Sequence, residues 1–268
     1  MKRASGRLAA LGATLAIVVA AGAGGCGWLI YPAPQTDARP LPADAQVVER
    51  VASDGVPVHA IWIADDTNSV AARAPAIVYF HGNGNVAGDA LGLARRARER
   101  GAAMLLAEYR GYGRSREGSP CEEGIYRDAE AVLAFLRDQG FGPERTVLWG
   151  YSLGSGVATE MALRGHASRL VLQAPFTSIP AMGSARFPWA PVRLLIGDRY
   201  DNLAKAERIR VPTLVVHGDA DEIVPFAMGV ELAKAIRGAE LLAVPELTHG
   251  GGPEFAWVLD RILDFALG

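Results

Sequence analysis

The chain has 268 residues, of which 50% are hydrophobic and 21% are charged, and its formal net charge is −2 at pH 7. This composition excludes an intrinsically disordered chain, and the balanced charge argues against a basic surface for nucleic acid. The two cysteines, Cys26 and Cys121, are too few for a disulfide framework or a cysteine-based zinc site. We therefore expect a globular protein with no nucleic-acid partner and no metal.

An apolar leader occupies residues 1–30. Three basic side chains lie in its first seven residues, and residues 8–30 contain no charge. The uncharged run is long enough to cross a bilayer as a helix. Alternatively it is a secretory signal, because residues 23–26 read AGGC and resemble a bacterial lipoprotein processing site, with alanine where leucine is usual and Cys26 as the lipidated residue. Both interpretations predict a membrane-anchored protein whose main domain lies outside the cytoplasm, in the bacterial cell envelope.

A proline-rich segment follows the leader. Residues 31–45 carry four prolines among polar residues, a composition that favours extended, semi-rigid chain. At ~3.1 Å per residue, such a spacer would hold the domain roughly 40 Å from the bilayer.

The rest of the chain, residues 46–268, has the pattern of an α/β domain. Residues 47–52 and 56–63 predict a β-hairpin around a Ser-Asp-Gly turn. Short apolar runs then alternate with helical stretches, which indicates a mostly parallel sheet covered by helices on both faces. The apolar runs are 76–80, 103–107, 146–149, 170–174, 213–216 and 240–244.

Two of the helical stretches carry further signals. Ser119 is the predicted N-cap of the clearest helix, because Pro120 and Glu122 complete a capping box, and Gly140 ends it. Residues 93–100 carry four arginines, which we interpret as a solvated helix face.

The strongest chemical signal follows the apolar run 146–149, where residues 150–154 read GYSLG. In a nucleophile elbow the serine occupies a strained strand-to-helix turn, and its neighbours two residues away must lack a Cβ. Gly150 and Gly154 meet that need, and small residues typical of a closely packed helix follow. Ser152 is therefore the candidate nucleophile, and the alternative is an inert serine in a glycine-rich turn.

An activated serine needs a base and an acid, which follow it in the chain in this architecture as acid and then histidine. His249 lies in the loop after the last apolar run and is the predicted base, whereas His217 ends a strand and is interpreted as structural. The acid is expected in the loop after residues 213–216. Asp221 is the predicted acid, with Asp219 as the alternative.

The oxyanion formed during acyl transfer needs backbone donors. The expected donors are the N–H groups of Leu153, next to the serine, and of Asn83, in the loop after residues 76–80. Residues 82–87 also fit a dinucleotide-binding pattern, with Glu108 as the ribose ligand. We reject that reading because it leaves the serine, aspartate and histidine series unexplained, so no cofactor is expected.

A short cap is expected between the sixth and seventh strands of the domain, at about residues 177–212. Phe176, Phe187, Trp189 and the apolar run 194–196 lie there or at its border. We expect the three aromatic side chains to contact the substrate. The alternative is that they pack the cap onto the domain.

Five segments resemble the α/β-hydrolase superfamily over residues 46–268, and within it the membrane-anchored, small-cap branch of serine aminopeptidase-like and depalmitoylase-like hydrolases. The segments are 79–85 (YFHGNGN), 109–115 (YRGYGRS), 150–154 (GYSLG), 174–178 (APFTS) and 217–221 (HGDAD). The branch usually has aspartate where this chain has Glu108.

This resemblance implies a serine hydrolase with an α/β-hydrolase fold, in which Ser152 is the nucleophile, Asp221 the acid and His249 the base. It implies cleavage of a small-molecule or acylated ester or thioester through an acyl-enzyme, without a cofactor. The same residues would serve an amidase or peptidase, because the pocket sets the leaving group. A non-catalytic envelope protein on this scaffold is the alternative from another class. The acyl group and the oligomeric state are left open.

Overall fold

The computed structural model describes residues 30–33, 37, 40–64, 74–189, 191, 192, 196–251 and 255–268. Within these ranges, eight strands form one sheet in the order β1-β2-β4-β3-β5-β6-β7-β8. The strands β1 and β2 form an antiparallel hairpin, β2 pairs with β4 antiparallel, and all pairs from β4 onward are parallel. The strands are β1 (Ala45–Val51), β2 (Pro57–Ile63), β3 (Ala76–Phe80), β4 (Ala103–Ala107), β5 (Thr146–Tyr151), β6 (Arg169–Gln173), β7 (Thr213–Gly218) and β8 (Glu240–Val244).

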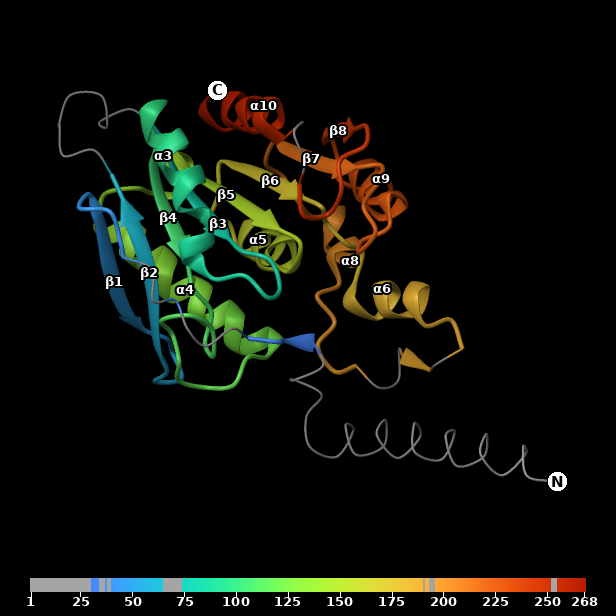
Figure 1. Cartoon of the computed structure of the whole chain (residues 1–268), viewed down its shortest axis with the longest axis horizontal. Coiled ribbons are helices and arrows are strands. Elements are labelled where there is room, and N and C mark those ends of the chain that lie inside the picture. Colours follow the sequence, from blue (N-terminus) through green and yellow to red (C-terminus); the bar gives the residue numbers. More distant parts are fainter. Residues whose placement is uncertain are drawn as a thin grey trace.

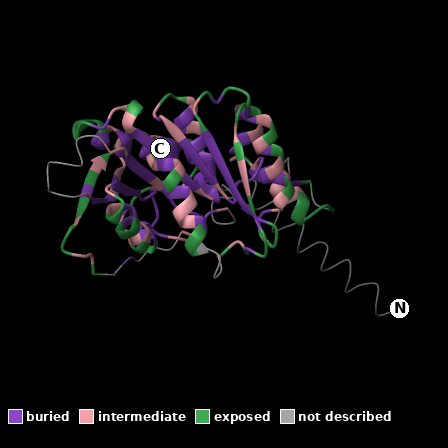
Figure 2. Cartoon of the chain, turned by 90° about the horizontal axis from the view of Figure 1, so that it is seen from above, coloured by how far each residue is buried: buried purple, intermediate pink, exposed green. Residues whose placement is uncertain are grey.

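Helices cover both faces of this sheet (Figure 1). One layer contains α3 (Leu91–Glu99) and α10 (Phe255–Leu267), and the other contains α4 (Glu122–Asp138), α5 (Leu153–Leu163), α8 (Asn202–Ala206) and α9 (Phe226–Ala235). The remaining helical elements are α6 (Ile179–Arg186) and the 3-10 turns η1 (Ala87–Ala90) and η2 (Pro143–Arg145). The sheet is buried between the layers, and the outer helix faces are exposed (Figure 2).

The central strands explain this layering. All of β4 is buried, and alternate side chains of β3 enter opposite cores: Val78 packs on the α4 and α5 side, and Ile77 on the α3 and α10 side. A strand whose two faces are both covered is expected to be apolar throughout rather than alternating. The predicted α/β architecture, including its N-terminal hairpin and helices on both faces, is confirmed.

Two local predictions need correction. The N-cap of α4 is Cys121 rather than Ser119, and no side chain caps this helix end. The arginine-rich face of α3 is not only solvated: Arg96 pairs with Asp260 at 3.0 Å, and Arg100 pairs with Asp264, both carboxylates of α10. The apparent basic surface is thus partly neutralised by the neighbouring helix.

The proline-rich segment is not a spacer where the structure describes it. Tyr31 is 3% exposed and packs in the core on the α4 side of the sheet, next to residues 198–200 of the cap. Asp37 is also buried. Its Leu41 packs against the α3 and α10 core, and β1 already begins at Ala45. The segment therefore lies along the domain, because an aromatic side chain and apolar groups within it find buried sites there.

Residues 1–29 of the predicted leader, including Cys26, lie outside the described residues. Within the described ranges, no helix has the length and apolar character needed to cross a bilayer.

Candidate functional site

Ser152 lies at a sharp turn between β5 and α5. Its φ is +50°, in the left-handed region that residues other than glycine rarely adopt. A Cβ on Gly150 would overlap the Gly154 carbonyl, and a Cβ on Gly154 would overlap the Phe80 carbonyl at the end of β3. The glycines thus permit a close approach that places the serine against the loop after β3.

His249 and Asp221 reach Ser152 from two other loops at the same edge of the sheet. Asp221 follows β7 and His249 follows β8, and the carboxyl ends of these parallel strands lie at one edge. The His249 Nε2 atom is 3.1 Å from Ser152 Oγ, and its Nδ1 atom is 2.8 Å from Asp221 Oδ2. The structure therefore brings together the three side chains that the sequence predicts to form a triad.

The Asp221 carboxylate is held from several sides. Its Oδ1 atom accepts hydrogen bonds from the backbone N–H groups of Ile223 and Val224 at 2.9 and 2.8 Å. Its Oδ2 atom faces His249 and also lies 3.3 Å from His217 Nε2. Burial alone would raise the pKa of Asp221, but the hydrogen bonds from His217 and His249 outweigh it and hold the pKa below its usual value. Asp221 is thus kept as a carboxylate that faces imidazole.

Asp219, the alternative acid, has another partner. Its Oδ1 atom accepts a hydrogen bond from the backbone N–H of Glu246 at 2.7 Å. This contact joins the loop after β7 to the loop after β8. Asp219 therefore closes the turn beside the site, while Asp221 meets the histidine.

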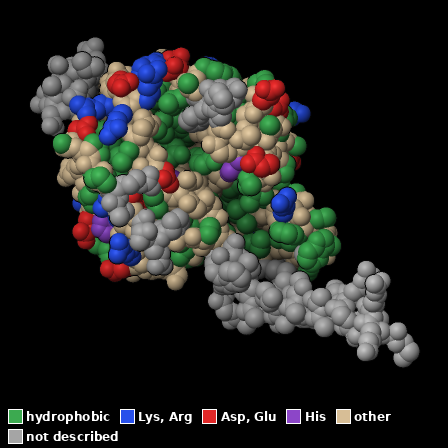
Figure 3. Space-filling model, viewed as in Figure 1, with side chains coloured by type: hydrophobic (Ala, Val, Ile, Leu, Met, Phe, Trp, Pro, Cys, Tyr) green, Lys and Arg blue, Asp and Glu red, His purple; other side chains and the backbone are tan. Residues whose placement is uncertain are grey.

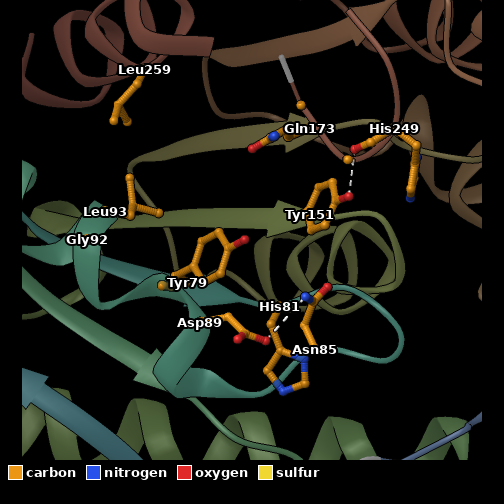
Figure 4. Close-up of a pocket in the computed structure, with 13 residues that line it drawn as sticks. Tyr79, His81, Asn85, Asp89, Gly92, Leu93, Tyr151, Gln173, His249 and Leu259 are labelled. Carbon is orange, nitrogen blue, oxygen red and sulfur yellow. Dashed lines mark hydrogen bonds between the residues drawn. The ribbon is translucent and has the colours of Figure 1, made fainter. Parts of the chain in front are cut away.

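Tyr151 is a site residue that sequence reasoning missed. Its hydroxyl donates a hydrogen bond to the His249 carbonyl at 2.7 Å, and its ring lies 5.3 Å from the imidazole (Figure 4). Burial, and then the charges of Asp221 and Glu222, raise the pKa of Tyr151 to about 12, so the phenol remains a donor at neutral pH. The His249 N–H in turn donates to Glu222 Oε2 at 3.2 Å. The backbone of His249 is therefore held on both sides by side chains.

The two predicted oxyanion donors differ in how they are positioned. Leu153 is the first residue of α5, so its N–H has no intrahelical acceptor. Asn83 lies in the loop after β3, where its Oδ1 atom accepts from Tyr112 at 2.8 Å and its Nδ2 atom donates to the Ile30 carbonyl. Because the Asn83 side chain is used to fix the loop, its backbone N–H is the group that could bind an oxyanion.

Glu108 supports the loop after β3 through contacts at both of its ends. Its Oε1 atom lies 2.8 Å from His81 Nε2, both side chains are 1% exposed, and its Oε2 atom accepts from the Ala87 N–H at 3.2 Å. A carboxylate engaged in this way is not placed to bind a ribose, which agrees with rejecting a dinucleotide site. Within the part of the chain that the structure describes, no group of three or more His, Cys, Asp or Glu side chains has an arrangement that could hold a metal ion.

A pocket of about 460 Å³ adjoins the histidine loop (Figure 4). Tyr151 and His249 line it together with polar side chains from β3, the loop after β3, η1 and β6, and apolar side chains from α3 and α10. These further lining residues include Tyr79, Asn85, Asp89, Gln173, Leu93 and Leu259.

The three aromatic residues expected to contact substrate do not line this pocket. Phe176 is 1% exposed in the core, so its position favours the packing alternative over substrate contact. Phe187 and Trp189 are 49% and 73% exposed and pack edge to face on each other, with ring centroids 6.2 Å apart. Leu194 and Leu195 lie outside the described residues, and Ile196 packs on the core.

Comparisons with known proteins agree with this fold. The profile of the alpha/beta hydrolase fold matches residues 75–204. An uncharacterized protein of Mycobacterium tuberculosis H37Rv is 33% identical over 211 residues, which cover 78% of this chain and 73% of that protein. The lysophosphatidylserine lipase ABHD12 of Danio rerio is 30% identical over 197 residues, which cover 64% of this chain and 51% of the lipase. The structure of Est1E from Butyrivibrio proteoclasticus with bound ferulic acid has a TM-score of 0.68 at 19% identity and covers 82% of this chain and 98% of that chain, a likeness that concerns the fold.

Proposed function

Because the chain belongs to the alpha/beta hydrolase fold family, we propose that it is a serine hydrolase that cleaves carboxylic esters or thioesters through an acyl-enzyme on Ser152. The observation that carries this proposal is the continuous hydrogen-bonded series from Ser152 Oγ through His249 to Asp221, with distances of 3.1 and 2.8 Å. The strained backbone of Ser152 adds support, because such strain is typical of a nucleophile elbow.

In the proposed reaction, His249 Nε2 accepts the Ser152 hydroxyl proton as Oγ attacks the substrate carbonyl carbon. The oxyanion that forms accepts hydrogen bonds from the N–H groups of Leu153 and Asn83. The proton then passes from His249 to the leaving alcohol or thiol, and the carbon–heteroatom bond breaks. A water molecule, deprotonated by His249, attacks the ester on Ser152 and releases the acid. Asp221 keeps Nδ1 protonated, so Nε2 is free to act as the base.

The printed names of two similar proteins favour esters and thioesters over amides as the substrates of this chain. Est1E carries bound ferulic acid, and ABHD12 is named a lysophosphatidylserine lipase. The same residues would cleave an amide. The substrate panel therefore includes an anilide of the acid whose ester is tested, as a test of the amidase alternative.

We also propose that the protein is anchored in a membrane by its first 30 residues, with the hydrolase domain outside the cytoplasm. The support is in the sequence: basic residues precede an uncharged apolar run at residues 8–30, and within that run residues 23–26 read the lipoprotein-like AGGC.

The direct test of the enzymatic proposal is turnover of p-nitrophenyl esters by the full-length chain in detergent. Ser152→Ala should lower kcat by on the order of 10⁴ to 10⁶, as when the nucleophile of a working triad is removed. Ser155→Ala is the matched control, because Ser155 is a buried serine of α5 three residues away. Equal activity of the Ser152→Ala variant and the wild type would overturn the proposal.

A further inference from the structure

The chain that leaves the leader is attached to the rim of the candidate site. The Ile30 carbonyl accepts a hydrogen bond from Asn83 in the loop after β3. The next residue, Tyr31, is buried, and its hydroxyl lies 2.6 Å from Asp198 Oδ2 and 3.1 Å from the Tyr200 hydroxyl. These contacts tie residues 30–33, which we name the strap, both to the proposed oxyanion loop and to residues 198–200 of the cap.

The strap limits how far the domain can stand from the membrane. If residues 8–30 form a helix across the bilayer, that helix ends at Ile30 itself. If Cys26 carries the lipid, Ile30 follows four positions further along the chain, a reach of at most ~14 Å. Either anchor therefore holds the rim of the site close to the bilayer surface.

The cap presents aromatic side chains on the side of the strap. At the end of α6, Arg186, Phe187 and Trp189 are all exposed, and the two rings pack on each other. Hydrophobic side chains gather over this end of the molecule in Figure 3. Exposed tryptophan beside a basic residue is typical of protein surfaces at the interface between water and lipid.

A second exposed apolar side chain borders the site from another loop. Ile223 is 55% exposed, and its N–H donates to Asp221. Ile223 thus borders the site from the loop after β7, and the aromatic pair lies at the end of α6 in the cap. The exposed Trp257 lies on α10, in the helix layer on the other face of the sheet from the cap.

We propose that the face formed by the strap, Phe187, Trp189 and Ile223 docks on the bilayer that holds the leader, so that the site receives its acyl substrates from that membrane. This inference rests on the proposed function and its anchor, and it adds the orientation of the domain and the source of the substrate. Lipid headgroups surround the two cap rings, and the scissile carbonyl of a membrane-borne ester or thioester reaches Ser152 without leaving the interface. A second copy of the chain or a soluble protein on the same face is the competing occupant.

Tryptophan fluorescence in vesicles tests this orientation. The full-length chain is reconstituted in phosphatidylethanolamine and phosphatidylglycerol vesicles, with or without bromine on the acyl chains near the headgroups. Of the five tryptophans, only Trp28 in the leader and Trp189 are expected within reach of the quencher. Trp189→Phe should therefore remove about half of the quenchable fluorescence, since one of two interfacial rings is lost. Trp257→Phe, the matched control, should leave it unchanged.

The outcomes distinguish the docking proposal from the enzymatic proposal. Equal quenching in the Trp189→Phe and Trp257→Phe variants overturns the docking, as does a chain that fails to bind vesicles or a dimer in which Trp189 is shielded from lipid. Hydrolysis of a water-soluble ester by the wild-type chain in detergent is measured in parallel. Quenching without Ser152-dependent hydrolysis contradicts the enzymatic proposal alone, and hydrolysis without quenching contradicts the docking alone.

Discussion

Asp221 contacts two imidazoles, and this double contact explains why one of two nearby carboxylates is suited to the role of triad acid. His217 and His249 both approach Oδ2, while two backbone N–H groups hold Oδ1. The acid is therefore fixed in position before it meets the base. Asp219, two residues earlier, is also an aspartate, but its carboxylate accepts a hydrogen bond from the Glu246 backbone.

Asp221→Asn should lower kcat by about 10⁴, because an amide favours the wrong His249 tautomer. Asp219→Asn should change kcat far less, since the residue closes a turn and does not touch His249. Steady-state kinetics on one soluble ester compare the two variants. The reverse ranking would show that the acid is assigned to the wrong residue.

Tyr151 is expected to act as a positioning residue through its bond to the His249 carbonyl. Tyr151→Phe keeps the ring but removes that bond, and a loss of about 1.4 kcal/mol would lower kcat roughly tenfold with little change in KM. Tyr126→Phe is the control, because the Tyr126 hydroxyl is also hydrogen-bonded, at 2.7 Å to Glu122, but on α4. A change confined to KM, or an equal loss in both variants, would contradict the positioning role.

The sequence alone predicted the three residues of the candidate triad, but not the side chains that hold them in position. Ser152 is recognisable by its flanking glycines, and His249 and Asp221 by their order after the strands. Tyr151 gains its role from a contact with His249, 98 residues further along the chain, and His217 from a contact with Asp221 across the loop after β7. Neither side chain carries a signal of such a partner in the sequence.

At the scale of elements, the strands were easier to predict than the contacts and ends of the segments that connect them. Continuous apolar runs identified β3 to β8 to within about two residues. For the inner strands β3 to β7 the reason is that burial on both faces imposes that pattern, whereas β8 is a partly exposed edge strand. Prolines suggested a free spacer, yet Tyr31 finds its partner Asp198 at a separation of 167 residues. Ser119 likewise resembled a cap, although α4 begins after Cys121. Such tertiary contacts override local composition.

The strap should contribute measurably to stability. Tyr31→Ala removes a buried aromatic side chain and should lower the free energy of unfolding by about 3 kcal/mol. Tyr31→Phe loses only the hydrogen bonds and should cost about 1 kcal/mol. Urea unfolding of the full-length chain in detergent measures both. Val51→Ala, at a residue 64% exposed on β1, should stay within about 0.5 kcal/mol of the wild type. A Tyr31→Ala variant as stable as this control would mean that the strap is not docked in solution.

The whole molecule combines a rigid α/β domain with a site whose rim is joined to the leader. Three loops at the carboxyl edge of the sheet carry the series, and the strap is hydrogen-bonded to the loop after β3 beside it. Under the proposed anchoring, a domain arranged in this way lies next to its anchor rather than at a distance from it, and the nature of the anchor has a direct test.

Cell fractionation of the full-length chain tests the anchor. The wild type should sediment with membranes. Cys26→Ser should alter its processing and electrophoretic mobility if Cys26 is lipidated, and should have no effect if an uncleaved helix holds the chain. Recovery of the intact wild type in the soluble fraction would contradict both forms of the anchor.

The central claim, that Ser152 is a nucleophile activated by His249, is tested most directly by labelling with a fluorophosphonate probe and locating the adduct by mass spectrometry. We predict one adduct, on Ser152, that is absent in Ser152→Ala and strongly slowed in His249→Ala, while Ser155→Ala is labelled like the wild type. An adduct on another residue, or labelling of Ser152 that does not depend on His249, would contradict the account.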